Sequence, residues 1–245
     1  ITLAVALEIC GFDQVFKKVG MEPTGDPFNS LMKLENTDSS PYNPMINAGA
    51  IVVASCLASE ISFDTMLDTI RALCMDPDIN LDKKVYHSEM SHISRNRAIA
   101  YLLESKGYIE KNKDVENSLH FYVKMCSLSV TAESLAGLGL ILANDGIHPD
   151  TGKRLLSSQA VKIVKTLMFT CGMYDGSGEF AVRVGIPSKS GVGGGILSVV
   201  DGEMGIGIFG PALDKKGNSV AGECVLEYMS HELHLHMFDP QRHTL

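Results

Sequence analysis

Toward the C-terminal end, apolar residues alternate with glycine or polar residues in a way that predicts a small antiparallel sheet. Two runs show this period of two, one from Phe180 to Ile186 and one from Met204 to Ile208. Asp201-Gly202, just ahead of the second run, is a strong signal for a hairpin turn. We therefore predict a three-strand meander whose middle strand begins at Lys189-Ser190-Gly191.

Glycine is concentrated in the same stretch, because nine of the 23 glycines lie between Gly185 and Gly210. Glycine weakens the interior of a strand, so a strand that carries many of them usually has a ligand or another backbone close against it. Its peptide N–H groups are then accessible. The pattern favours a strand that can build an oxyanion hole.

Helical spacing of apolar residues dominates the rest of the chain. Asn47 and Ser62 are predicted to cap two of the helices. The segment 21–44 is rich in proline and is predicted to be a connection. The order of elements predicts an α+β or mixed α/β architecture, with one sheet covered by helices. The expected helices span residues 1–19, 48–59, 63–74, 87–106, 117–127, 131–144, 158–169 and 219–234.

Composition excludes several classes of partner. The chain has 245 residues, 45% of them hydrophobic, and a net charge of -8. This charge argues against nucleic acid and anionic membranes as partners. No apolar stretch is long enough to span a bilayer and no basic signal region opens the chain, so we expect a cytoplasmic protein. The six cysteines form no C-x-x-C pair and are predicted to be small buried residues in a reducing compartment.

One polar pair lies on a helical face that is otherwise predicted to be core. Glu89 and Asn96 are two turns apart on the expected 87–106 helix, roughly 10 Å along its axis, a span that brackets a small zwitterion. A buried carboxylate needs a positive partner, such as a ligand ammonium. The alternative is a surface helix whose Glu89 pairs with a nearby Arg or Lys. The same stripe contains Ile93, Ala100 and Leu103.

The C-terminal histidines invite a zinc-protease interpretation. His231-Glu-Leu-His234 contains the start of H-E-x-x-H, but the second histidine of that motif would fall on Leu235. With His236, these residues are predicted to form the polar side of the terminal helix. We expect no metal and no cofactor.

Six motifs occur in the order and approximate spacing found in the serine-dependent glutaminases, and the resemblance covers nearly the whole chain. Two of them are similar to the bacterial branch in particular. One such motif would be weak evidence, whereas six in register are strong. The motifs are Glu22-Pro-Thr-Gly-Asp-Pro-Phe-Asn-Ser30, Asn43-Pro-Met-Ile-Asn-Ala-Gly-Ala50, Ser88-Glu-Met-Ser-His-Ile-Ser-Arg-Asn-Arg97, Ala143-Asn-Asp-Gly-Ile-His-Pro149, Cys171-Gly-Met-Tyr174 and Pro187-Ser-Lys-Ser-Gly-Val192.

The resemblance implies a β-lactamase/transpeptidase-like α/β fold, in which an antiparallel sheet packs with a helical cluster. It implies a single catalytic domain over residues 1–245, helical to about residue 170, with the meander and terminal helix over about 171–238. The implied reaction is hydrolysis of L-glutamine to L-glutamate and ammonia. A serine in an S-x-x-K motif attacks the side-chain amide and forms an acyl-enzyme. Homodimers or homotetramers are the implied assembly.

The resemblance also implies roles for individual residues. Tyr174 would relay a proton to the leaving ammonia, and the Val192 N–H would be one oxyanion donor. Glu89 would hold the α-amino group. The remaining contacts to the α-amino and α-carboxylate groups would come from Asn47, Asn96 and Tyr122. The structural alternatives are a helix cap for Asn47 and a core aromatic for Tyr122.

The family's S-x-x-K motif and an upstream tyrosine do not occur in the sequence at the matching place. Ser30-Leu-Met-Lys33 has the spacing but aligns with a different segment, so we interpret it as a coincidence. We expect the motif to precede Ile1, and a protein of these 245 residues alone to be inactive. Two alternatives stay open: a penicillin-binding or β-lactamase-type acyl transferase, since Lys189-Ser190-Gly191 resembles K-T-G, and a catalytically silent glutamine-binding module.

Overall fold

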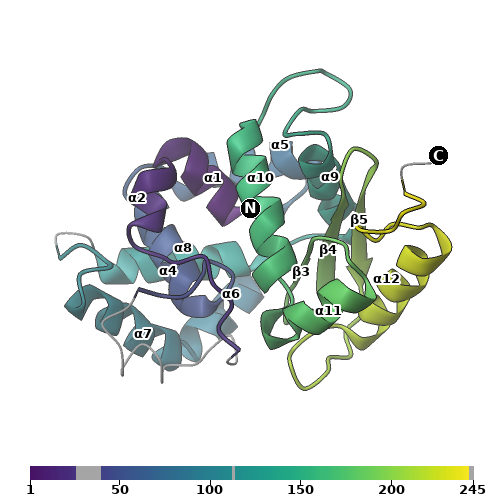
Figure 1. Ribbon diagram of the computed structural model, residues 1–245. Helices are drawn as coiled ribbons and strands as arrows, with labels where there is room; N and C mark the ends of the chain where they lie inside the picture. The colour runs from purple at the N-terminus through teal and green to yellow at the C-terminus, as the bar shows by residue number, and fades with distance from the viewer. Residues whose placement is uncertain (26–39, 112–113, 243–245) are drawn as a thin grey trace. The chain divides into compact units, whose positions relative to one another are not determined.

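The computed structural model describes residues 1–25, 40–111 and 114–242 (Figure 1). They form two compact units. Unit 1 comprises Ile1–Ala72 and Pro77–Val130, and unit 2 comprises Leu73–Asp76 and Thr131–Leu245. The prediction of one catalytic domain stays a prediction, because compactness alone does not say whether the units fold independently. The Ser30 to Lys33 segment lies outside the described residues.

Unit 1 is helical around a single apolar helix, α4. Nine residues of α4 are buried, and it packs against α1, α7 and α8. A helix that is hydrophobic on all sides belongs in a core, and no helix in the described part of the chain is long and apolar enough to cross a membrane. The elements are α1 (Thr2–Ile9), α2 (Phe12–Phe16), α4 (Asn47–Leu57), α6 (Lys83–Ser91), α7 (Ser94–Ser105), α8 (Val115–Cys126), β1 (Asn80–Leu81), β2 (Leu128–Ser129) and α5 (Phe63–Cys74), whose last two residues belong to unit 2.

The predicted helix over 87–106 is wrong as one element, because it breaks at His92 into α6 and α7. In a continuous helix the Ser88 carbonyl would accept the His92 N–H. Instead the Ser91 hydroxyl donates to that carbonyl at 2.7 Å, and the His92 ring Nδ1 lies 2.9 Å from it. The His92 N–H turns to the Glu89 carbonyl at 3.1 Å. Side chains that compete for backbone groups thus end α6.

Two other expectations for unit 1 need correction. The predicted 1–19 helix is interrupted at Gly11, whose φ of 82° is one that glycine tolerates and other residues avoid. Asn47 does not cap α4, since it is the first helical residue and the N-cap is Ile46. The Ser62 cap is confirmed, because its Oγ accepts from the Thr65 N–H at 3.1 Å.

Unit 2 combines a three-strand antiparallel sheet, in the order β3-β4-β5, with helices. Thr131 and Ser134 form a capping box at the start of α9, and Ser219 caps α12. Figure 1 shows α9 running along the sheet, consistent with its extensive packing against β5. The elements are α9 (Ala132–Ala143), α10 (Ser158–Cys171), η1 (Tyr174–Gly176), α11 (Ser177–Arg183), β3 (Ser188–Ser190), β4 (Gly195–Val200), β5 (Met204–Phe209) and α12 (Val220–Glu232).

The structure confirms a meander of three antiparallel strands, but not all the residues that were predicted to form them. The run from Phe180 is helical (α11), so Lys189-Ser190 belongs to the first strand and not to the middle one. Phe180 and Val184 are buried and Val182 is 80% exposed. Residues four apart share one face of a helix, so the burial of Phe180 and Val184 is what a helix predicts. The alternation of apolar residues in the sequence is equally compatible with a strand. The Asp201-Gly202 turn is confirmed between β4 and β5.

The glycines of β5 are there because α9 lies directly on them. A Cβ at Gly207 would be 1.8 Å from the Ala132 carbonyl oxygen, and one at Gly205 would be 2.2 Å from the Ala136 carbonyl oxygen. A strand rich in glycine was expected to have either a ligand or another backbone close against it. For β5 it is another backbone, that of α9. Gly193 differs, since a Cβ there would meet no atom within 4 Å.

We expect Gly207→Ala to lower the free energy of unfolding by about 1–3 kcal/mol, because the methyl group forces α9 off the sheet. Gly193→Ala is the matched control and should change this free energy by less than about 0.5 kcal/mol. Urea unfolding followed by circular dichroism measures both. Equal values for the two variants would contradict the close approach of α9 and β5.

The cysteines are only partly the buried residues that we predicted. Cys56, Cys74 and Cys171 are buried, but Cys126 and Cys224 are exposed, and all six are free thiols. Burial raises the pKa of the Cys74 thiol to about 11. At neutral pH this thiol therefore stays protonated and unreactive.

Candidate functional site

In unit 1 a hydrogen bond joins two of the predicted site residues. Asn47 Nδ2, at the start of α4, donates to Asn96 Oδ1, in the first turn of α7, at 3.0 Å. Both residues are half-buried. This bond leaves Asn47 Oδ1 as an acceptor and Asn96 Nδ2 as a donor. An ammonium group needs a hydrogen-bond acceptor and a carboxylate needs a donor, so this pair suits the two ends of an amino acid.

The loop ahead of α4 fixes the position of Asn47. Asn43 is buried, donates from Nδ2 to the Glu22 carbonyl at 2.8 Å and accepts from the Met45 N–H at 3.0 Å. A Cβ at Gly49 would lie 1.9 Å from the Asn43 carbonyl oxygen, so this loop packs directly on α4. From the sequence, Asn43 stood out only as the first residue of a motif. In the structure it holds the loop, a role that depends on contacts with distant residues and not on local spacing.

Glu89 is exposed, so the expectation of a buried carboxylate is wrong. It lies in the last turn of α6, a helix without a single buried residue. The break at His92 separates α6 from the apolar stripe on α7, where Ile93, Ala100 and Leu103 are buried as predicted. Glu89 pairs with no Lys or Arg among the described residues, so its carboxylate is available to a cation from solution.

Tyr122 is half-buried on α8 and packs against the apolar core of unit 1. The helix that carries it is tied to α7 by Arg97, which donates to both carboxylate oxygens of Glu116 at 2.8 and 3.0 Å. These hydrogen bonds hold the pKa of Glu116 below its usual value. Tyr122 thus has the contacts of a core aromatic, which was the structural alternative to a binding role. Its role toward a ligand stays a prediction.

In unit 2, Tyr174 has an unusual backbone conformation, with a φ of 56°. For a bulky residue this costs roughly 1–3 kcal/mol and is worth a functional hypothesis. The strain is held by Ser177, whose Oγ accepts from the Met173 N–H at 3.0 Å and donates to the Tyr174 carbonyl at 2.8 Å. No compositional signal could have predicted this dihedral.

The Tyr174 side chain contacts the strand that carries Lys189. Its hydroxyl donates to the Ser190 carbonyl at 3.1 Å, and the Lys189 ammonium lies 4.4 Å from the ring centroid. Lys189 also donates to the Ser190 carbonyl. The Ser190 N–H donates to the Gly172 carbonyl at 3.0 Å. Two motifs that lie 16 residues apart are thereby locked together.

Val192 lies in the tight turn between β3 and β4. The turn is closed by the Gly191 N–H, which donates to Gly195 at 2.9 Å, and the Gly194 N–H, which donates to Gly191 at 2.8 Å. Within the described ranges the Val192 N–H has no acceptor, and the residue is 52% exposed. An open backbone donor is what an oxyanion needs.

The predicted site residues are divided between the two units. Asn47 and Asn96 are in direct contact in unit 1, and Glu89 on α6 and Tyr122 on α8 belong to the same unit. Unit 2 holds Tyr174 and Val192 on adjoining motifs. Each set of residues lies within one unit.

The C-terminal histidines are placed differently from the prediction. α12 ends at Glu232, so His234 and His236 follow the helix and do not lie on its polar side. His234 Nδ1 is 3.1 Å from Asp239 Oδ2. In residues 1–25, 40–111 and 114–242, no group of three or more His, Cys, Asp or Glu side chains could hold a metal.

Comparisons with known proteins show which family this chain resembles. A family model described as Glutaminase matches residues 1–238. The glutaminase of Clostridioides difficile strain 630 is 53% identical over 242 residues, covering 97% of this chain and 78% of that protein. The crystal structure of a probable glutaminase of Bacillus subtilis superposes with a TM-score of 0.91 at 39% identity, covering 97% of this chain and 80% of that one.

A second solved relative, the Bacillus subtilis glutaminase YbgJ, gives a TM-score of 0.85 at 36% identity, covering 97% of this chain and 78% of that one. These neighbours have the β-lactamase-like fold, which confirms the fold class predicted from the resemblance. Both the family model and the relatives match nearly the whole length of the sequence, so the chain belongs to the glutaminase family.

Proposed function

We propose that the chain hydrolyses L-glutamine to L-glutamate and ammonia through a covalent acyl-enzyme. The reaction follows from membership of the glutaminase family, whereas the covalent route and the residue roles are our proposal. The observation that supports the recognition roles is the Asn47 to Asn96 hydrogen bond, which leaves one amide acceptor and one amide donor for a ligand. L-Glutamine offers the matching ammonium and carboxylate.

The chemistry of one relative supports the covalent route. YbgJ of Bacillus subtilis forms a covalent complex with 5-oxo-L-norleucine on reaction with 6-diazo-5-oxo-L-norleucine. That compound carries the backbone of glutamine and a carbonyl where glutamine has its side-chain amide carbon. The diazo compound loses N2 as a nucleophile of the enzyme bonds to the carbon next to that carbonyl, which places a nucleophile beside the position of the glutamine amide carbon in YbgJ. A serine nucleophile is the proposal drawn from the family resemblance.

Recognition of the amino acid is assigned to unit 1. The Glu89 carboxylate and Asn47 Oδ1 accept from the α-ammonium, while Asn96 Nδ2 and the Tyr122 hydroxyl donate to the α-carboxylate. A ligand that lacks the ammonium leaves Glu89 without a cation. A free amino acid is therefore favoured over a simple amide, by the modest amount that an ion pair at an exposed carboxylate contributes.

The bond-breaking steps are assigned to unit 2. The Val192 N–H donates to the oxygen of the tetrahedral intermediate, together with the N–H of the nucleophilic serine. The Tyr174 hydroxyl passes a proton to the departing ammonia. Water then attacks the acyl-enzyme, releases L-glutamate and restores the serine.

We expect Glu89→Gln to weaken L-glutamate binding by about fivefold, because an ion pair at an exposed carboxylate contributes up to about 1 kcal/mol. Calorimetry with L-glutamate measures this dissociation constant. Glu60→Gln is the matched control, since Glu60 is exposed in unit 1 and pairs with no described Lys or Arg. A change below about twofold for Glu89→Gln would remove Glu89 from the site. Detectable binding of a β-lactam would favour the acyl-transferase alternative.

Location and assembly belong to the same proposal. We infer a cytoplasmic homodimer or homotetramer, with support from the family resemblance and the net charge of -8. Sedimentation equilibrium over a range of protein concentrations measures the assembly, and a monomer at every concentration would contradict it.

A further inference from the structure

Unit 2 contains a second pocket that none of the residues assigned to glutamine lines. Its volume is about 300 Å³, at the lower end for small-molecule sites. One face of α10 forms one wall, and the tail that follows α12 forms another. The apolar lining residues are Phe169, Pro187, Val199, Leu235 and Met237.

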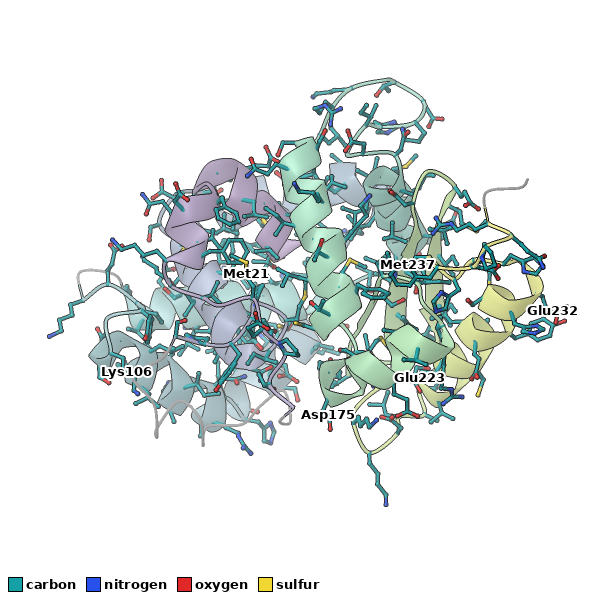
Figure 2. All side chains as sticks on the ribbon, viewed as in Figure 1. Met21, Lys106, Asp175, Glu223, Glu232 and Met237 are labelled. Carbon is teal, nitrogen blue, oxygen red and sulfur yellow. The ribbon has the colours of Figure 1, made fainter. Side chains whose placement is uncertain are left out.

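The tail that forms this wall is fixed by specific contacts. The Met237 N–H donates to the Gly185 carbonyl at 3.0 Å, and a Cβ at Gly185 would be 2.1 Å from the His236 ring. Arg242, whose side chain is 12% exposed, donates to the Asp201 carbonyl at 3.1 Å and to Glu203 at 3.3 Å. Met237, labelled in Figure 2, is thus held against the pocket. The pocket is preformed.

The charges at the pocket leave one cation unmatched. Lys165 is paired with Asp201, and Asp145 accepts from Arg154 and Ser158 at 3.1 and 2.6 Å. Lys162 lines the same pocket, is exposed, and forms no ion pair with any residue in the described part of the chain. An anion that enters the pocket therefore meets one available ammonium next to an apolar surface.

The other charged cavity, in contrast, is internally neutralised. It has a volume of about 250 Å³ and is lined by residues of η1, α11, α12 and the loop before α12. Its Lys216 is paired with Glu179 at 3.0 Å, and Arg183 with Glu179 and Glu227. Burial raises the pKa of Glu223, which is labelled in Figure 2. This cavity offers an anion no available cation.

We propose that the pocket between α10 and the tail binds a small monocarboxylate with an apolar body. The carboxylate pairs with Lys162, and the apolar body covers Phe169 and Met237. L-Glutamate does not fit this chemistry, because its second carboxylate and its ammonium would be desolvated against the apolar wall without partners. The site is therefore distinct from the one that binds substrate.

The test uses two probes of nearly the same shape, 3-phenylpropionate and its uncharged amide, 3-phenylpropanamide. Ligand-observed NMR titration of the full-length protein gives both dissociation constants. We expect the carboxylate to bind with a Kd of about 1 mM or tighter, as its eleven heavy atoms allow. It should bind about fivefold more tightly than the amide, the upper end for an exposed ion pair.

Lys162→Gln should remove that fivefold preference without weakening binding of the amide. Lys215→Gln, at an exposed lysine outside the pocket, should leave the preference unchanged. Met237→Glu should abolish binding of both probes, because it places a carboxylate in the apolar wall, and saturating L-glutamate should not compete. The proposal is overturned if the native protein binds neither probe, if carboxylate and amide bind equally, if Lys162→Gln keeps the preference, or if L-glutamate displaces the probe.

Discussion

Tyr174→Phe should lower kcat for L-glutamine by about 10²- to 10⁴-fold and leave KM nearly unchanged, as expected when a general acid or base is removed. Phenylalanine keeps the ring that the Lys189 ammonium contacts and removes only the hydroxyl that donates to the Ser190 carbonyl. The lost group acts on the departing ammonia, so the effect falls on the chemical step. Steady-state ammonia release from the full-length protein measures both constants.

Tyr228→Phe is the control for this experiment. Tyr228 is 68% exposed on α12 and is not assigned to the site, so its loss should leave kcat unchanged. If Tyr174→Phe retains kcat within about threefold of the native value, the hydroxyl is not a proton carrier. In that case the strained backbone at Tyr174 would need another explanation.

Val192→Pro should lower kcat by about 10²- to 10³-fold, the typical effect of losing one oxyanion donor. Proline has no backbone N–H, so the substitution removes the donor directly. Val192→Ala retains the N–H and trims a side chain that is largely in solvent. We therefore expect the alanine variant to keep nearly full activity in the same ammonia-release assay.

The pair of variants separates the donor from the side chain. Unfolding midpoints and L-glutamate affinity should match the native values in both, since the turn is closed by glycine hydrogen bonds and the amino acid contacts are assigned elsewhere. If the proline and alanine variants lose activity equally, or the proline variant loses none while remaining folded, Val192 is not an oxyanion donor.

Local patterns predicted the parts of the fold that local forces determine. The Ser62 cap is confirmed, because a hydroxyl that accepts an N–H three residues on needs no tertiary context. The β4 to β5 hairpin was predicted for the same reason. Phe180 to Ile186 was predicted wrongly as a strand because a short apolar run suits either structure, and packing of Phe180 and Val184 decided for helix.

The candidate site shows a similar division. The family resemblance pointed to Asn47 and Asn96, and the structure brings their amides together. Spacing left open whether Glu89 is buried or lies on a surface helix, and side chains that take the Ser88 carbonyl and end α6 early leave it exposed. The left-handed backbone of Tyr174 was equally out of reach, because strain is held by contacts and has no signature in composition.

The central claim is that Glu89 recognises the ammonium of the glutamine whose amide is hydrolysed. It is tested most directly by measuring kcat/KM for L-glutamine and for 4-carbamoylbutanoate, the same molecule without the α-amino group, in the native protein and in Glu89→Gln. We predict that native enzyme prefers L-glutamine, and that Glu89→Gln reduces this preference about fivefold while its rate with 4-carbamoylbutanoate is unchanged. An undiminished preference for L-glutamine in Glu89→Gln, or an equal fall for both substrates, would contradict the account.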